Sequence, residues 1–313
     1  MKVGIIGAGA VGSSTAFALI MKNVARKVVL IDANEKKAAA EALDMAHATP
    51  FANANKVKSG TYQDLNDADV VIVTAGATML KGETRIDLLE KNVKIFKNII
   101  PQIKENAPNC IILVATNPVD IMTAVALKLC GFDKNKVIGS GTVLDSARFK
   151  TALGKYFGIS SQSLHSYVLG EHGDSEVLAW SCATGANLDL SSLGQQLNKE
   201  ITSEIKADIE KHVKYSAYGI LEDKGNTCYG IAGALTRICQ AIKDNEYAVL
   251  TVSTVHDEVE GVEDICLSLP SVVGKRGIHQ VVVPRLNDCE HKDLQSSAEK
   301  LKEYSVKALS LVD

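Results

Sequence analysis

The chain has 313 residues, and its 34 Lys and Arg against 37 Asp and Glu give a formal net charge of −3 at pH 7. This near-neutral balance offers no electrostatic argument for a nucleic-acid partner. The 46% hydrophobic content and the six prolines exclude a disordered or collagen-like chain, and the length predicts about two domains.

The first element is an uncharged stretch from Val3 to Met21, in which Ala16 and Ala18 imitate the small residues of a signal-peptide cleavage site. Four glycines, two serines and a threonine make the stretch a poor apolar core for a signal peptide or a membrane span. No other uncharged run is long enough to cross a bilayer. We therefore expect a cytoplasmic protein with no membrane partner.

Strands and helices alternate through the N-terminal half. Short, continuous runs of Val and Ile predict strands that are buried on both faces of a parallel sheet, over Lys2–Ile6, Val28–Ile31, Val70–Val73, Ile111–Val114 and Lys136–Ile138. Helices are predicted between them, over Ser13–Asn23, Glu35–Ala46, Arg85–Asn106 and Asp120–Leu129, with Gly131 as a C-terminal cap. This order predicts a doubly wound α/β domain over residues 1–140.

The pattern changes in residues 141–313, which we expect to form an α+β substrate-binding domain. Strand-like segments over Leu164–Leu169 and Ala248–Thr254 are separated by a long polar helix predicted over Leu193–Leu221. The closing helix is amphipathic, with one face made by Leu294, Ala298, Leu301 and Ala308. No Pro/Gly/Ser-rich linker joins the halves, so they should pack tightly and share a cleft.

The sequence Gly7-Ala8-Gly9-Ala10-Val11-Gly12 matches GxGxxG between a predicted strand and a predicted helix. In that context the glycines allow a tight turn, close approach of a pyrophosphate and packing of helix on strand. Asp32 ends the second strand 20 residues after Gly12, where a carboxylate can bind a ribose hydroxyl and repel a 2′-phosphate. The pattern predicts a Rossmann domain that binds NAD rather than NADP; the alternative is a glycine turn beside a surface aspartate.

His172 lies between glycines in Leu169-Gly170-Glu171-His172-Gly173-Asp174, just after a predicted strand. Hydride transfer to a ketone needs a proton donor near neutral pH, and imidazole suits that task. Asp145 is a candidate to orient the ring, and Arg148, on the same helix face, could hold a substrate carboxylate by two parallel hydrogen bonds. The alternative is a structural Asp–Arg pair on a helix surface.

These motifs also carry a resemblance. GAGAVG, Ala115-Thr116-Asn117-Pro118-Val119-Asp120, the segment from Leu144 to Arg148 and the loop around His172 occur in the order found in the NAD-dependent L-lactate/L-malate dehydrogenase family. The resemblance covers nearly the whole chain. It implies that His172 is the proton donor and acceptor, Asp145 its partner and Arg148 the carboxylate clamp. It also implies that Asn117 lies beside the nicotinamide and the substrate carbonyl, that Arg85 polarises that carbonyl as a loop closes, and that Thr227 lines the pocket.

The segment before Arg85 bears on the substrate. Within the family, Gly82-Glu83-Thr84-Arg85 resembles bacterial lactate dehydrogenases, since the malate enzymes usually have Met in place of Glu83. Six residues before Arg85, lactate enzymes generally have Gln and malate enzymes Arg, whereas this chain has Met79. Met79 cannot pair with a second carboxylate. We expect lactate and pyruvate as substrates, then longer aliphatic or aromatic 2-keto acids, then malate.

The resemblance raises the question of regulation as well. Many bacterial lactate dehydrogenases bind fructose 1,6-bisphosphate through an arginine and a histidine whose positions here hold Lys150 and His165. Lysine lacks the two-pronged fork that suits phosphate. The equal alternative is that Lys150 is a surface lysine, that His165 is a strand histidine and that no effector binds. The family also implies a homotetramer.

Two other classes remain open. A binding module that holds NAD without chemistry would explain the glycines and Asp32, but it would leave His172, Asp145, Arg148 and Arg85 without a task. An NAD-dependent glycosidase would need a metal held by a Cys/His pair. The seven cysteines form no CxxC pair, and we expect no metal site.

Overall fold

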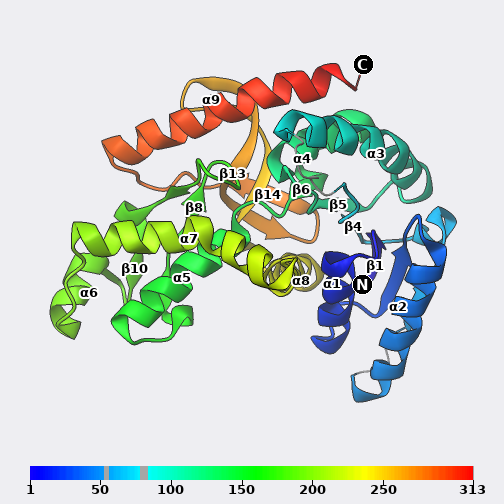
Figure 1. The fold of residues 1–313 in the computed structure, drawn as a ribbon, viewed down its shortest axis with the longest axis horizontal. Coiled ribbons are helices and arrows are strands. Elements are labelled where there is room, and N and C mark those ends of the chain that lie inside the picture. Colours follow the sequence, from blue (N-terminus) through cyan, green and yellow to red (C-terminus); the bar gives the residue numbers. More distant parts are fainter. Residues whose placement is uncertain (53–55, 78–83, 313) are drawn as a thin grey trace.

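The computed structural model describes residues 1–52, 56–77 and 84–312. In this part of the chain, nine strands form one sheet in the order β14-β13-β12-β6-β5-β4-β1-β2-β3 (Figure 1). Its strands are β1 (Lys2–Ile6), β2 (Lys27–Ile31), β3 (Lys56–Ser59), β4 (Val70–Val73), β5 (Ile111–Val114), β6 (Val137–Gly139), β12 (Ala248–Val259), β13 (Val262–Gly274) and β14 (Gly277–Val281). From β3 to β6 every pairing is parallel, while β12, β13 and β14 are added antiparallel.

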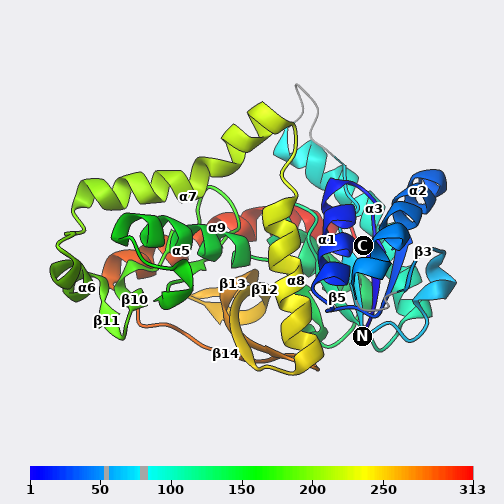
Figure 2. The ribbon, with the colours of Figure 1, turned by 90° about the horizontal axis from the view of Figure 1, so that it is seen from below.

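Helices cover both faces of this sheet and extend to one side of it (Figures 1 and 2). They are α1 (Ala10–Met21), α2 (Glu35–Ala48), α3 (Arg85–Asn106), α4 (Val119–Cys130), α5 (Val143–Phe157), α6 (Leu190–Leu197), α7 (Ser203–Lys224), α8 (Tyr229–Asp244) and α9 (Asp288–Ser310). The order β3-β2-β1-β4-β5-β6 with its crossover helices confirms the predicted Rossmann fold. Among the described residues, no helix combines the length and the apolar character that a membrane span requires.

Alternate strand residues supply two separate cores, which is why the strand sequences are continuously apolar. Val71 and Val73 face a cluster shared with α3, α4 and α9, whereas Val70 and Ile72 face a cluster shared with α1, α2 and α8. Helices α8 and α9 belong to the C-terminal half, yet α8 packs on α1 and α9 packs on α4, which are helices of the N-terminal half. The two halves are thus packed together, as the missing linker predicted, while the boundary near residue 140 stays a prediction.

Two predictions for the C-terminal half were wrong. The long helix over Leu193–Leu221 is two helices, because Asn198 turns into the left-handed region with φ 53° after α6 and Thr202 caps α7. The strand over Leu164–Leu169 is two short strands, β7 (Leu164–His165) and β8 (Val168–Leu169), in different sheets. β7 lies in a sheet with β10 (Thr184–Gly185) and β11 (Leu188–Asp189), and β8 pairs with β9 (Val177–Leu178).

Candidate active site

His172 lies in a loop, Gly170–Glu176, that leaves strand β8 and is fastened to two other elements. Gly170 exchanges backbone hydrogen bonds with Ser268 of β13, at 2.9 and 3.0 Å. The backbone N–H of Glu171 donates to the hydroxyl of Ser297 on α9 at 2.9 Å. Gly170 has a φ of +80°, and a Cβ there would meet Ser297 Oγ at 2.6 Å, so this position requires glycine. The loop is therefore held in place before any ligand binds.

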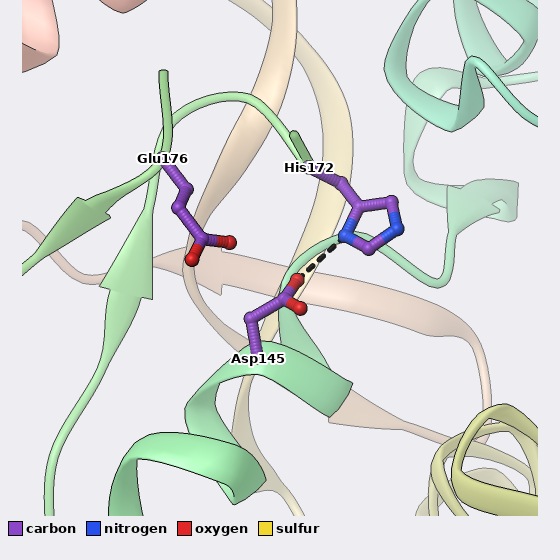
Figure 3. Close-up of side chains that lie close together, drawn as sticks. All are labelled: Asp145, His172 and Glu176. Atoms are coloured by element: carbon purple, nitrogen blue, oxygen red, sulfur yellow. Dashed lines mark hydrogen bonds and ion pairs between the residues drawn. The ribbon is translucent and has the colours of Figure 1, made fainter. Parts of the chain in front are cut away.

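The Asp145 carboxylate joins His172 to Arg148. Asp145 Oδ2 lies 2.6 Å from His172 Nδ1, and Asp145 Oδ1 accepts a hydrogen bond from Arg148 Nη1 at 2.8 Å. Asp145 and Arg148 share a face of helix α5 at a spacing of three residues, as the sequence predicted. Figure 3 shows Asp145 rising from its helix toward the ring of His172. Asp145 is 1% and Arg148 18% exposed, so the pair lies largely beneath the surface, unlike the surface pair of the alternative interpretation.

The neighbouring charges shift the pKa values of His172 and Asp145. The Asp145 charge raises the pKa of His172 from 6.5 to about 9, against the effect of burial. Burial acts to raise the pKa of Asp145, but the charges of His172 and Arg148 outweigh it and hold that pKa below its usual value. At neutral pH the pair is thus an imidazolium beside a carboxylate. With Nδ1 bound to Asp145, the ring nitrogen left to exchange a proton is Nε2.

A second carboxylate, Asp120, fixes the backbone of the loop. Asp120 stands in the first turn of α4 and is 1% exposed. Its Oδ2 accepts the backbone N–H of His172 at 2.8 Å, and its Oδ1 accepts the hydroxyl of Ser253. Burial raises the pKa of Asp120 to about 6. Asp120 ends the motif that begins at Ala115, but its spacing in the sequence did not predict this role.

A third carboxylate, that of Glu176, lies at the far end of the loop. The sequence did not predict that Glu176 would be part of the site. One carboxylate oxygen of Glu176, one of Asp145 and one ring nitrogen of His172 all lie within 4.8 Å of one another (Figure 3). Such a trio can hold a metal ion, but two ligands of a tetrahedral zinc ion, bound at about 2.0 Å, stand about 3.3 Å apart. Asp145 Oδ2 and His172 Nδ1 are closer than that, at 2.6 Å. The geometry therefore favours proton chemistry over metal binding.

At the other end of the parallel sheet's carboxyl edge lies a cavity of about 650 Å³ lined by Gly7, Gly9 and Asp32, among others. A Cβ on Gly12 would lie 1.9 Å from the carbonyl oxygen of Gly7, whereas a Cβ on Gly9 would meet nothing within 4 Å. Gly12 is required by packing, and Gly9 leaves open space at the N-terminus of α1, as the approach of a pyrophosphate demands. Val11, in the first turn of α1, is half-buried and packs against the core.

Asp32 faces this cavity with its carboxylate held by the backbone. Oδ2 accepts the N–H of Ala8 at 2.6 Å, and Oδ1 accepts the N–H of Asn34 at 2.8 Å. The carboxylate therefore connects the glycine turn to the end of β2, in the place where a ribose hydroxyl is bound in this fold. These features fit NAD.

The other predicted residues are distributed around the two halves. Asn117 is exposed beyond the end of β5, where its backbone carbonyl oxygen accepts a hydrogen bond from Asn92 Nδ2 at 2.8 Å. Thr227 is half-buried in the connection between α7 and α8. Arg85 begins α3, but its side chain is not described, and Met79, Lys81 and Glu83 lie outside the described residues. No contact in the described chain tests the roles predicted for these residues.

The two predicted effector residues stand on different elements. Lys150 lies on α5 beside Arg237 of α8, and burial and then the Arg237 charge lower its pKa. His165 is exposed on β7.

Comparison with known proteins gives concordant results over the whole chain. The model for the NAD-binding domain of lactate/malate dehydrogenases matches residues 1–139, and the model for the α/β C-terminal domain of the same enzymes matches residues 142–312. The chain is 49% identical to the L-lactate dehydrogenase of Thermus aquaticus, over 96% of this chain and 97% of the relative. It is 44% identical to L-lactate dehydrogenase 1 of Clostridium acetobutylicum, over 96% of each.

The fold is similar to that of solved structures as well. The minor L-lactate dehydrogenase of Enterococcus mundtii, solved in a ligand-bound form, superposes with a TM-score of 0.94 at 37% identity and covers 98% of each chain. These similarities, together with the Asp145–His172 pair, favour an enzyme over a binding module that holds NAD without chemistry.

Proposed function

The chain belongs to the lactate/malate dehydrogenase family and has NAD-dependent L-lactate dehydrogenase activity, and from this premise we propose a role for each residue of its site. The reaction is the reversible reduction of pyruvate to L-lactate. The observation that carries the proposal is the buried Asp145 carboxylate, bound at once to His172 and to Arg148.

His172 exchanges the proton. When bound, NADH supplies a hydride to the carbonyl carbon of pyruvate. The carbonyl oxygen then needs a proton, and His172 gives it from Nε2 while Asp145 holds Nδ1 and stabilises the ring in its charged form. In the direction of lactate oxidation, neutral His172 takes the proton back. With a pKa of about 9, His172 is protonated at neutral pH, so reduction should decline only as the pH rises through 9.

Arg148 holds the substrate carboxylate. Nη1 donates to Asp145, and the guanidinium group has further N–H donors that can form a two-pronged pair with a carboxylate. Arg148 is also only 18% exposed, so a substrate carboxylate bound there would be largely shielded from water. Arg85 would polarise the substrate carbonyl, Asn117 would border the nicotinamide and Thr227 would line the pocket. NAD itself would be held by Gly7, Gly9, Val11 and Gly12 at the start of α1 and by Asp32 on the ribose.

Substrate choice is tested by comparing four keto acids. Met79 offers no charge to a second carboxylate, so oxaloacetate would bring an unpaired charge into the pocket. We expect the highest kcat/KM with pyruvate, lower values with 2-ketoisocaproate and phenylpyruvate, and the lowest with oxaloacetate, when NADH oxidation is followed in parallel. A preference for oxaloacetate would reject the role given to Met79. Each assay is run with and without fructose 1,6-bisphosphate.

The effector arm of that experiment rests on Lys150, His165 and Arg237. Arg237 Nη2 pairs with Glu246 at 2.6 Å, while its Nη1 is buried and has no hydrogen-bond partner in the described chain. A cationic pair of this kind, Lys150 beside Arg237, favours a phosphorylated effector. A pyruvate saturation curve unchanged by the bisphosphate would remove this part of the proposal.

We also propose a homotetramer in the cytoplasm. Apolar side chains are exposed along the end of α7 and the start of α8, as expected for a subunit contact, at Tyr215, Tyr218, Ile220, Leu221 and Tyr229. The seven cysteines are all free, which suits a reducing compartment.

A further inference from the structure

Glu176 is a buried carboxyl that the mechanism above does not use. Its side chain is 4% exposed, and its Oε1 has no hydrogen-bond partner in the described part of the chain. It reaches within 4.8 Å of both His172 and Asp145, and Figure 3 shows its carboxyl group on the same side of the loop as Asp145. A buried polar atom without a partner is costly, so its retention at this place calls for a function.

Asp145 and Glu176 cannot both be ionised cheaply, because two like charges this close in a buried site repel strongly. Asp145 keeps its charge, since it alone is bound to Arg148 and His172. Burial and then the charge of Asp145 raise the pKa of Glu176 from 4.5 to about 8. Glu176 is therefore neutral at pH 7 and acquires its charge in the alkaline range, just before His172 would lose its proton.

We propose that Glu176 is a positioning residue that keeps His172 protonated as the pH rises, because its ionisation places a second negative charge beside the ring. This inference rests on the proposed role of His172 as proton donor. The negative charge of Glu176 acts in the same direction on His172 as that of Asp145. Below pH 8 the largely neutral carboxyl adds little, and the charges of Asp145 and Asp120 keep His172 protonated.

The proton that Glu176 releases has a way to solvent. Glu176 lines a polar cavity of about 380 Å³ that lies between the catalytic loop, α7 and α9. Water in this cavity can accept the proton without passing the substrate. The charged groups that face Glu176 directly are Asp145, His172, Arg148 and Lys214. Those lining the rest of the cavity are Asp174, Lys206, Glu210, Glu290, Asp293 and Lys300.

The test is Glu176→Gln, which keeps the size and the neutral state and removes the ionisation. At pH 6.5 we expect kcat/KM for pyruvate within about twofold of wild type. In the alkaline range the decline should begin about one pH unit earlier, so that kcat/KM at pH 9 falls about fivefold. In the opposite direction the variant should match wild type at pH 7 and oxidise lactate several-fold faster at pH 8.5, where wild-type Glu176 is ionised and more of the variant's His172 is neutral. A variant with a merely damaged site would be slower in both directions.

Asp293→Asn is the matched control, because it removes one negative charge from the exposed rim of the same cavity. We expect it to keep the wild-type pH profile. If Glu176→Gln slows both directions alike, leaves the profile unchanged, or shifts it no more than Asp293→Asn, the inference is wrong. None of these results would affect the assignment of pyruvate reduction, which fails only if the wild type does not turn over pyruvate.

A measurement on the wild type alone avoids any effect of substitution on folding. Infrared spectra with ¹³C-labelled glutamate should show the carbonyl band of a protonated glutamic acid that disappears with a midpoint near pH 8, as the pKa of Glu176 requires. A band already absent at pH 6.5 would overturn the proposal.

Discussion

The two ends of the site are built in different ways. At the dinucleotide end the geometry comes from the backbone, because Gly12 packs on Gly7 and the Asp32 carboxylate accepts two backbone N–H groups. All of these residues lie within one strand-helix-strand unit. At the catalytic end, buried charges from three separate segments converge, with His172 held by Asp145 of α5 and Asp120 of α4. Cofactor binding at the dinucleotide end therefore depends on backbone conformation, whereas proton transfer at the catalytic end depends on buried charge.

This difference predicts that one charge at the catalytic end matters more than any single residue at the dinucleotide end. Asp145→Asn removes the largest contribution to the raised pKa of His172, and it leaves Arg148 without its partner. We expect kcat/KM for pyruvate to fall by about 10³-fold at pH 7, within the range of general acid catalysis. The remaining activity should decline at a lower pH than in wild type, because the His172 pKa falls back toward 6.5.

The affinity for NADH, measured by fluorescence titration, separates the two ends in this variant. We expect it to change by less than about threefold, since Asp145 does not line the cavity of the glycine motif. A comparable loss of NADH affinity and of turnover would mean that the two ends are one unit, and the comparison would not hold.

The glycines of the dinucleotide end allow a sharper test. In Gly12→Ala the new methyl group would lie 1.9 Å from the Gly7 carbonyl oxygen, so the backbone must shift. We expect at least a tenfold loss of NADH affinity together with a loss of stability of about 1–3 kcal/mol, measured by denaturant unfolding. Turnover at saturating NADH should stay within a few-fold of wild type.

Gly9→Ala is the matched variant, because its methyl group meets no protein atom within 4 Å. It should lose NADH affinity while the free energy of unfolding is unchanged. If Gly9→Ala binds NADH normally, the open space beside Gly9 is not where the cofactor approaches.

The sequence predicted the dinucleotide end better than the catalytic end, for a physical reason. β4 and β5 were predicted to the residue, since strands buried on both faces are short and continuously apolar. Their order around GxGxxG then defines a binding edge within one local unit. At the catalytic end, chemistry alone offered Asp145 as a candidate partner of His172, and the resemblance to a family implied the same pairing. Glu176 was missed because an acidic residue in a Gly-rich loop gives no sign that tertiary packing will bury it.

The C-terminal half shows the same limit in its elements. β13 contains Pro270, which weakens a strand pattern, although here Pro270 pairs with Thr251 inside the long antiparallel ladder. α8 contains Gly230 and Gly233, which lower helix propensity, yet the helix is stabilised by the core that it shares with α1. Long-range packing decides these elements, and a single sequence carries little local information about it.

The smallest effect is expected at Asp32, where conformation and charge act together. Asp32→Asn removes the charge that would repel a 2′-phosphate, and one of the N–H groups of Ala8 and Asn34 loses a carboxylate acceptor. We expect NADH affinity to fall a few-fold, while the ratio of kcat/KM for NADPH to that for NADH rises about tenfold, equivalent to about 1.4 kcal/mol. Glu35→Gln is the control, because Glu35 lines the same cavity but accepts neither backbone N–H group. If Glu35→Gln changes the cofactor ratio as much as Asp32→Asn does, selection depends on the total charge of the cavity, and the dinucleotide end would then depend on charge just as the catalytic end does.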